Sequence, residues 1–141
     1  MTAPYAHIAC CFDGSAASEA AVAEARRLLG GDGRLSVVHV HHDPPIYGGM
    51  YEPDLGAVRE TAARWFAEKA GEWPGAEAVF LEGAATVELD AWLERHQPDL
   101  VVAGVHHGAA RRAVLGSVTN HLVQHAPCPV LIVRVHEEES S

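Results

Sequence analysis

The chain reads Leu100-Val-Val-Ala-Gly104-Val-His-His-Gly108-Ala-Ala-Arg-Arg-Ala-Val-Leu-Gly116-Ser117 where an apolar run passes through a glycine-containing loop into a helix start. Residues 100–103 predict a buried strand, and residues 118–126 predict a helix with Ser117 as its N-cap. The first turn of such a helix presents unpaired N–H groups and the positive end of the helix dipole, which together can bind an anion. The alternative is a turn that only reverses the chain, and glycine spacing alone does not decide between them.

Apolar runs and amphipathic helices alternate along the rest of the chain. Strands are expected at residues 7–12, 35–40, 78–81, 100–103 and 130–135, and helices are expected to begin near Ser15, Asp54, Thr86 and Ser117. Strands separated by helices predict an α/β fold with a mainly parallel sheet and helices on both faces. Ligands bind such sheets beyond the carboxyl ends of the strands, where the winding reverses. If the first and fourth strands are neighbours, the turn Asp13-Gly14-Ser15 faces the loop at residues 104–117 across that crevice.

Length and composition limit the function classes. The chain has 141 residues, 48% of them hydrophobic and 21% charged, which predicts one globular domain. The net charge of −9 makes nucleic acid and anionic membranes poor partners, since the electrostatic interaction would be repulsive overall. No apolar stretch reaches membrane-spanning length and no leader pattern opens the chain, so a cytoplasmic protein is expected. The domain is expected to span residues 1–136, with residues 137–141 as a disordered tail.

The cysteines do not indicate a disulfide framework or a zinc site. Cys10, Cys11 and Cys128 show no paired spacing, and we expect buried thiols. Adjacent residues of a strand point to opposite faces, so Cys10 and Cys11 cannot easily meet the same partner.

Four parts of the sequence together resemble the universal stress protein family. They are the opening Ile8-Ala-Cys-Cys-Phe-Asp13-Gly-Ser15-Ala-Ala-Ser-Glu19-Ala-Ala, the short Leu81-Glu-Gly83, the strand Asp99-Leu-Val-Val-Ala-Gly104, and the close from Gly116-Ser117-Val-Thr-Asn-His to Pro129-Val-Leu-Ile-Val-Arg134. The similarity runs from about Tyr5 to Arg134. It implies an open five-stranded parallel sheet in the order 3-2-1-4-5, adenine nucleotide alpha hydrolase-like, and often a dimer. One branch of the family binds ATP or AMP, and another lacks the nucleotide loop.

The nucleotide loop departs from the pattern that this resemblance supplies, which is Gly, two residues, Gly, nine residues, Gly, then Ser or Thr. Gly104 and the pair Gly116-Ser117 match, but His107 stands in the place of the second glycine and the loop is one residue shorter. Either Gly108, one position late, takes over the role of that glycine, or the His107 side chain blocks the phosphate and weakens binding. Retained binding is the favoured interpretation.

The resemblance implies a role for each residue of a nucleotide site. Asp13 would hydrogen-bond the ribose or base region, and Val40 would pack on the adenine ring. The phosphates, with or without Mg²⁺, would be held by backbone N–H groups and a hydroxyl at Gly104, Gly108, Gly116, Ser117 and Val118, with charge from Arg111 or Arg112. The structural alternatives are an Asx-turn at Asp13 and a plain N-cap at Ser117, and both are compatible with a ligand.

Ten histidines are the unusual feature of the composition. His39, His41 and His42 end the second expected strand, and His106 and His107 follow the fourth, so both groups would flank Asp13. His41, His107 and Asp13 therefore define an alternative in which the crevice binds a metal ion, or binds its ligand in a pH-dependent way. His121 and His125 are four residues apart on the last helix and could chelate, although an exposed and a half-buried histidine are the commoner arrangement. No metal site is assigned.

Catalysis has little support in the sequence. There is no nucleophile elbow, and the single lysine, Lys69, lies inside an expected helix, which excludes a P-loop. Slow ATP hydrolysis is the most that a bound nucleotide would undergo.

The last expected strand bears on assembly. In the implied order the apolar residues Val130 to Val135 form an exposed edge, and a homodimer through this strand would cover it. Two function classes therefore stay open. The first is a nucleotide-binding stress or signalling module, in which occupancy changes the loop at residues 41–53 and the choice of protein partner. The second is a dimeric protein that acts through protein partners with an empty or differently filled crevice.

Overall fold

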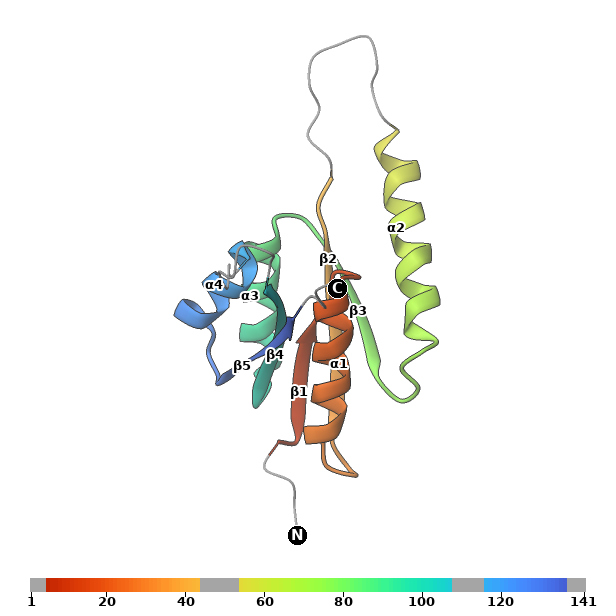
Figure 1. Ribbon diagram of the computed structural model, residues 1–141. Coiled ribbons are helices and arrows are strands. Elements are labelled where there is room, and N and C mark those ends of the chain that lie inside the picture. Colours follow the sequence, from red (N-terminus) through yellow and green to blue (C-terminus); the bar gives the residue numbers. More distant parts are fainter. Residues whose placement is uncertain (1–4, 44–53, 108–115, 137–141) are drawn as a thin grey trace, which may run out of the picture.

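The computed structural model describes residues 5–43, 54–107 and 116–136 and shows a parallel sheet between two layers of helices (Figure 1). The strands are β1 (His7–Cys11), β2 (Arg34–His41), β3 (Glu77–Glu82), β4 (Leu100–His107) and β5 (Val130–His136), and the helices are α1 (Ala16–Leu28), α2 (Leu55–Ala70), α3 (Ala85–His96) and α4 (Ser117–His125). The order β3-β2-β1-β4-β5, with every neighbouring pair parallel, confirms the predicted fold class. β1 stands where the winding reverses. Most of the expected loop at residues 41–53, and the expected tail at residues 137–141, lie outside the described residues.

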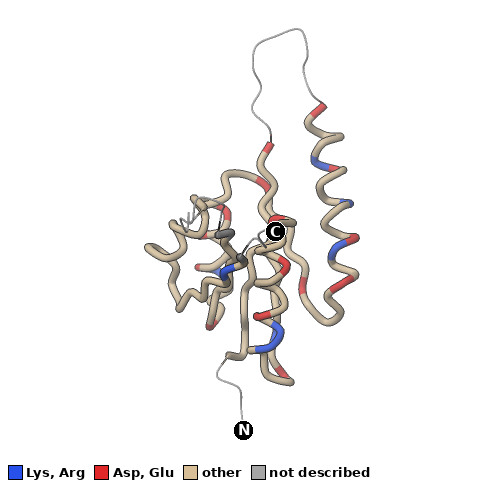
Figure 2. The backbone as a smooth tube through the Cα atoms, in the orientation of Figure 1, with Lys and Arg blue, Asp and Glu red and all other residues tan. Residues whose placement is uncertain are grey.

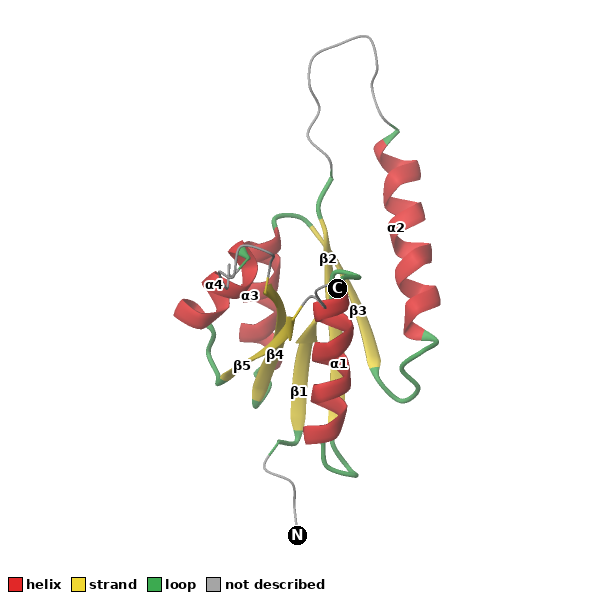
Figure 3. Ribbon diagram, viewed as in Figure 1, coloured by secondary structure: helices red, strands yellow, loops and turns green. Residues whose placement is uncertain are grey.

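Two hydrophobic cores lie on opposite faces of the sheet, beneath α1 and α2 on one side and beneath α3 and α4 on the other (Figure 3). Along β1, Ile8 and Cys10 enter the first core, whereas Ala9 and Cys11 face the second. Successive side chains of a strand alternate between its faces, so the adjacent cysteines are separated as the sequence predicted. All three cysteines are free thiols.

Helix α1 begins as predicted and brings its first turn to the carboxyl end of β1. Ser15 is the N-cap, and its Oγ accepts a hydrogen bond of 3.1 Å from the Ser18 N–H. Ala21 and Ala25 are fully buried against the sheet. This small-residue face lets the helix lie close to the sheet, where it contacts β4 most and then β5 and β1.

Helix α2 covers the β2–β3 end of the same face less completely. Phe66 is its one fully buried side chain, while the other members of the expected apolar face, Leu55, Val58, Ala62 and Trp65, are partly exposed. In Figure 1 the N-terminal end of α2 extends beyond the carboxyl ends of the strands.

Strand β4 is longer than the sequence indicated. It continues past Ala103 to His107, because residues 104–107 pair with residues 133–136 of β5. The segment Gly104-Val-His-His107 is typical of a loop, so only the partner strand reveals this extension.

The predicted N-cap of α4 is wrong. The helix begins at Ser117, and Gly116 is the N-cap, with φ −60° and ψ 163° and no side-chain hydrogen bond. Glycine tolerates the extended N-cap conformation at little cost, so the serine lies inside the first turn instead of before it. The start of α3 shifts in the same way, to Ala85, with Ala84 as its N-cap in place of the predicted start at Thr86.

Candidate functional site

Two adjoining hollows lie at the carboxyl ends of β1 and β4. The first has a volume of about 140 Å³ and the second about 360 Å³. Asp13, Gly104, Val118 and Thr119 line both, so the hollows form one crevice. The crevice lies at the topological switch point, where parallel α/β sheets bind their ligands.

The smaller hollow is an apolar chamber. Its lining includes Cys11, Val40, Leu89, Ala103 and Val118, contributed by three strands and by α3 and α4. Burial raises the pKa of the Cys11 thiol to about 12, and the nearby Asp13 carboxylate acts in the same direction. Cys11 is therefore an uncharged, apolar part of the wall at neutral pH. A flat apolar group such as a nucleobase fits the chemistry of this chamber.

Asp13 stands between the chamber and the larger hollow. Its Oδ1 accepts a hydrogen bond of 2.9 Å from the Ser15 N–H, so the Asx-turn considered from the sequence is present. Burial would raise the pKa of Asp13, but hydrogen bonds from Ser15 and Ser18 outweigh it, and the pKa lies below its usual value. The carboxylate is thus charged at neutral pH. Because a carboxylate offers about four acceptor positions, it can still accept hydroxyl donors from a ligand.

The N-terminus of α4 forms the wall of the larger hollow, which Gly116, Ser117, Val118 and Thr119 line. The first intrahelical hydrogen bond runs from the Asn120 N–H to the Gly116 carbonyl, at 2.9 Å. The N–H groups of Ser117, Val118 and Thr119 precede it and have no partner within the helix. Three N–H donors without an intrahelical partner and the positive end of the helix dipole therefore meet beside the apolar chamber.

The two glycines of the loop pattern have different surroundings. A Cβ on Gly104 would overlap the main-chain carbonyl of Ala17 in the first turn of α1, so the close approach of α1 to β4 requires glycine there. A Cβ on Gly116 would meet no atom of the described residues within 4 Å, and the φ of −60° is open to any residue. Within the described residues, the fold therefore explains Gly104 without a ligand, whereas it does not explain Gly116.

The structure brings together most of the residues that the sequence analysis selected. Those that line the crevice are Asp13, Val40, Gly104, Gly116, Ser117 and Val118. Gly108, Arg111, Arg112 and the side chains of His106 and His107 lie outside what the structure describes. Sequence reasoning missed Thr119 and Leu89. Thr119 follows Ser117 by two positions and could have been found as part of the same helical turn, whereas Leu89 showed only as one apolar position of α3.

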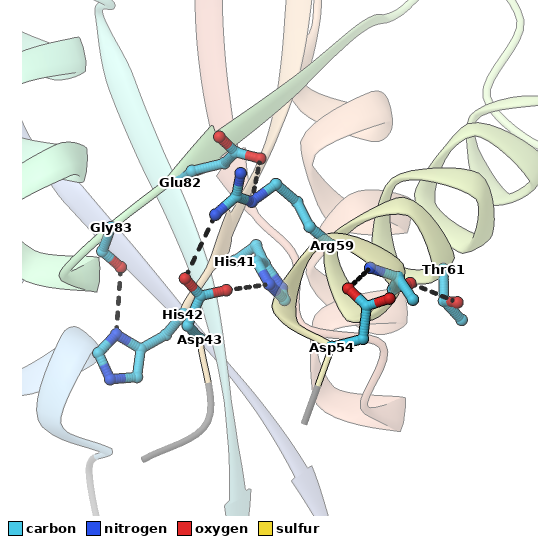
Figure 4. A network of polar contacts seen from close by, with 9 residues as sticks. His41, His42, Asp43, Asp54, Arg59, Thr61, Glu82 and Gly83 are labelled. Atoms are coloured by element: carbon cyan, nitrogen blue, oxygen red, sulfur yellow. Dashed lines mark hydrogen bonds and ion pairs between the residues drawn. The ribbon is translucent and has the colours of Figure 1, made fainter. Parts of the chain in front are cut away.

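Of the histidines at the end of β2, His39 lines the smaller hollow, whereas His41 and His42 line neither hollow. Figure 4 shows the polar contacts that His41 and His42 make instead. His41 lies on Phe80, with ring centroids 5.9 Å apart, and its Nε2 is 3.1 Å from Asp43 Oδ1. Arg59 continues this network with ion pairs of 3.4 Å to Asp43 and 3.1 Å to Glu82. His41 is thus part of the anchor of α2 and is not paired with Asp13 as the metal alternative required. Within the described part of the chain, no three His, Cys, Asp or Glu residues are placed to hold a metal ion.

The histidine pair of α4 consists of one half-buried and one exposed side chain, as the commoner alternative predicted. His121 is half-buried, with its Nε2 2.7 Å from Asp90 Oδ2, and His125 is exposed. Their ring centroids are 4.6 Å apart. His121 joins α4 to α3, and neither histidine lines the crevice.

Among the helices that the structure describes, none is long and apolar enough to cross a membrane. Helix α2 carries the basic residues Arg59, Arg64 and Lys69. Figure 2 shows basic positions in blue along this helix, and none on α4. The single lysine is engaged in ion pairs of 3.0 Å to Glu19 and 3.2 Å to Glu72.

Fold and crevice together define a class of parallel α/β proteins with a binding site at the switch point of the sheet. The chain belongs to the universal stress protein family, whose model matches residues 4–134. A Thermus aquaticus relative, named "Universal stress protein in QAH/OAS sulfhydrylase 3′region", is 35% identical over 130 residues, covering 87% of this chain and 94% of the relative.

Solved structures agree with this assignment. The universal stress protein UspA from Lactobacillus plantarum has a TM-score of 0.73 and 25% identity, over 92% of this chain and 98% of its own. A universal stress protein solved in complex with cAMP has a TM-score of 0.58 and 26% identity, over 92% of this chain and 96% of its own.

Proposed function

We propose that this chain binds an adenine nucleotide, AMP or ATP, in the crevice between β1 and β4, and that it acts as a stress-response or signalling module in the cytoplasm. The observation that carries the proposal is the juxtaposition of an apolar chamber, an ionised Asp13 and the first N–H groups of α4, which have no partner within the helix. The base, ribose and phosphate of a nucleotide follow one another in the order of the chamber, Asp13 and the start of α4. The complex of a family member with cAMP supports the ligand class.

Each part of the nucleotide has a counterpart in the crevice. The adenine ring would pack on Val40 and Leu89, and the ribose hydroxyls would donate hydrogen bonds to Asp13. The phosphate would accept hydrogen bonds from the N–H groups of Ser117, Val118 and Thr119. Gly104 and Gly116 line the phosphate hollow, where a ligand can approach the main chain closely.

The size of the crevice agrees with such a ligand. Pockets for small molecules and cofactors typically have volumes of roughly 300–1,000 Å³. The chamber of about 140 Å³ is too small for a whole nucleotide, and the hollow of about 360 Å³ supplies the remaining space. A nucleotide would therefore occupy both hollows, and Asp13 would lie beside its middle.

Calorimetric titration with AMP and with ATP, each with and without Mg²⁺, tests the proposal. Wild-type protein should release or absorb heat in a saturable way, and Gly116→Val should weaken binding at least tenfold, equal to about 1.4 kcal/mol, because its side chain would fill the phosphate hollow. Gly31→Val is a matched control, since a Cβ there also meets nothing within 4 Å and Gly31 lines neither hollow. Absence of heat and of a thermal shift at about millimolar nucleotide would reject the proposal.

We also propose that β5 pairs with its symmetry mate in a homodimer, an arrangement that fits either function class. β5 is an edge of the described sheet, and its apolar residues Val130, Leu131, Ile132 and Val133 are only partly buried. An apolar edge strand is a template for pairing with another chain, and a two-fold axis closes that pairing. Sedimentation at micromolar concentration tests this, and a monomer would contradict it.

A further inference from the structure

The turn that carries Asp13 is in contact with α2 on the side away from the crevice. The Trp65 ring stacks on Phe12, with centroids 5.8 Å apart and an interplanar angle of 23°. A Cβ on Gly14 would lie 2.7 Å from Trp65 Cζ2, so the indole fills the space beside that residue. Gly14 has φ +88°, a conformation that favours glycine. Trp65 therefore lies directly against the backbone of the turn, although it lines neither hollow.

The backbone before Asp13 is also tied to β2. The Phe12 N–H donates to the Val38 carbonyl at 2.9 Å, and His39 Nδ1 lies 2.8 Å from the Phe12 carbonyl oxygen. A carbonyl only accepts, so His39 donates from Nδ1. The His39 ring in turn packs edge-on against Trp65, with centroids 5.2 Å apart. The peptide units before Asp13 are thus fixed by β2, while those after it lie against the indole.

We propose that Trp65 is a positioning residue for the crevice: its ring supports the turn from Phe12 to Ser15 and thereby holds the Asp13 carboxylate where a ligand's hydroxyl groups meet it. This inference rests on the proposed function and adds a link to α2, an element outside the site. Coupling between two sites is reciprocal. A nucleotide in the crevice therefore stabilises the docking of α2, which carries Trp65 on a half-buried face.

Two variants of α2 separate support of the turn from general loosening of the helix. Trp65→Leu keeps an apolar side chain but removes the ring, and Val58→Ala trims a half-buried residue two turns earlier on the same helix. Trp65→Leu should weaken nucleotide binding by about fivefold or more, within the usual range of coupling between sites. Val58→Ala should change it by less than about twofold.

Hydrogen exchange provides a readout that needs no ligand. The Ser15 N–H is bonded to Asp13 Oδ1, so its exchange rate in the free protein reports the order of the turn. Trp65→Leu should accelerate this exchange and Val58→Ala should not. In wild-type protein, AMP should slow exchange of the α2 amides around Trp65.

The results separate the two proposals. If no nucleotide binds to wild-type protein, the proposed function fails, and exchange at Ser15 still decides whether Trp65 orders the turn. If Trp65→Leu leaves the Ser15 exchange rate unchanged, or if both variants change exchange and affinity equally, the positioning role is overturned. Should Trp65→Leu not fold, Trp65→Phe replaces it, because phenylalanine retains a smaller ring. Trp65→Phe should still change Ser15 exchange and nucleotide affinity more than Val58→Ala does, but by less than Trp65→Leu would.

Discussion

Alanine at Gly104 and at Gly116 should cost very different amounts of stability, because only Gly104 is packed against another described element. A methyl group on Gly104 would overlap the main-chain carbonyl of Ala17, and the Cβ of Ala17 would lie 3.0 Å away. Backbone atoms of a packed helix cannot rotate aside as the end of a side chain can. Forcing atoms into a well-packed core costs about 1–3 kcal/mol of stability. We expect Gly104→Ala to lower the free energy of unfolding by about 3 kcal/mol, because α1 itself must move.

Gly116→Ala adds the same methyl group where nothing lies within 4 Å. Alanine is a poorer N-cap than glycine, so we expect a loss of about 0.5–1 kcal/mol. Urea denaturation of both variants measures the difference, and thermal melting should place Gly104→Ala roughly 10 °C below wild type. Gly116→Ala should instead show its main effect on nucleotide affinity. Equal losses of stability in the two variants, or a loss below about 1 kcal/mol at Gly104, would refute the packing argument.

Three further expectations concern side chains at or near the ends of the strands. Burial, and then Arg34, lower the pKa of the buried His7, whose Nε2 is 2.9 Å from Ser36 Oγ. The contribution of neutral His7 to the free energy of unfolding is therefore fully present above about pH 6.5 and is lost as the pH falls below that value. Urea denaturation across this range should show a weaker dependence of the free energy of unfolding on pH in His7→Gln than in wild type. Ser117→Ala should change the free energy of unfolding by no more than about 0.5 kcal/mol, because Ser117 follows the N-cap; a loss above 1 kcal/mol by urea denaturation would indicate a capping role after all. Asp13→Asn keeps the Oδ1 acceptor for the Ser15 N–H, so the melting temperature should change little, and calorimetry should show weaker nucleotide binding because the amide accepts fewer hydrogen bonds than the carboxylate. A melting temperature that falls as much as in Gly104→Ala would contradict this.

The layered fold was predictable because local patterns specify it. The alternation along β1 separates Cys10 from Cys11, and the serine at position 15 caps α1 through the N–H of Ser18. Both features depend on residues only a few positions apart. The strand order came from family resemblance, since periodicity does not say which strands are neighbours.

The extent of β4 and the orientation of His41 are features that local sequence patterns do not specify. β4 extends to His107 because β5 supplies hydrogen bonds there, and no local signal separates this from a loop. His41 pairs with Asp43 and stacks on Phe80 of the adjacent strand, so its ring is engaged away from Asp13. Spacing along the chain brought the histidines of β2 to the correct end of the sheet, but it could not say to which face their rings turn.

Gly104 shows why a glycine pattern alone is ambiguous evidence for a ligand. It lines both hollows, and it also admits α1 to the sheet. A variant at Gly104 that lost nucleotide binding would therefore not separate a damaged site from a displaced helix. Gly116 has no described neighbour within 4 Å of a Cβ and an ordinary φ, so the described residues do not require glycine there. Of these two matching positions, Gly116 is the one at which loss of binding with retained stability would identify the phosphate site.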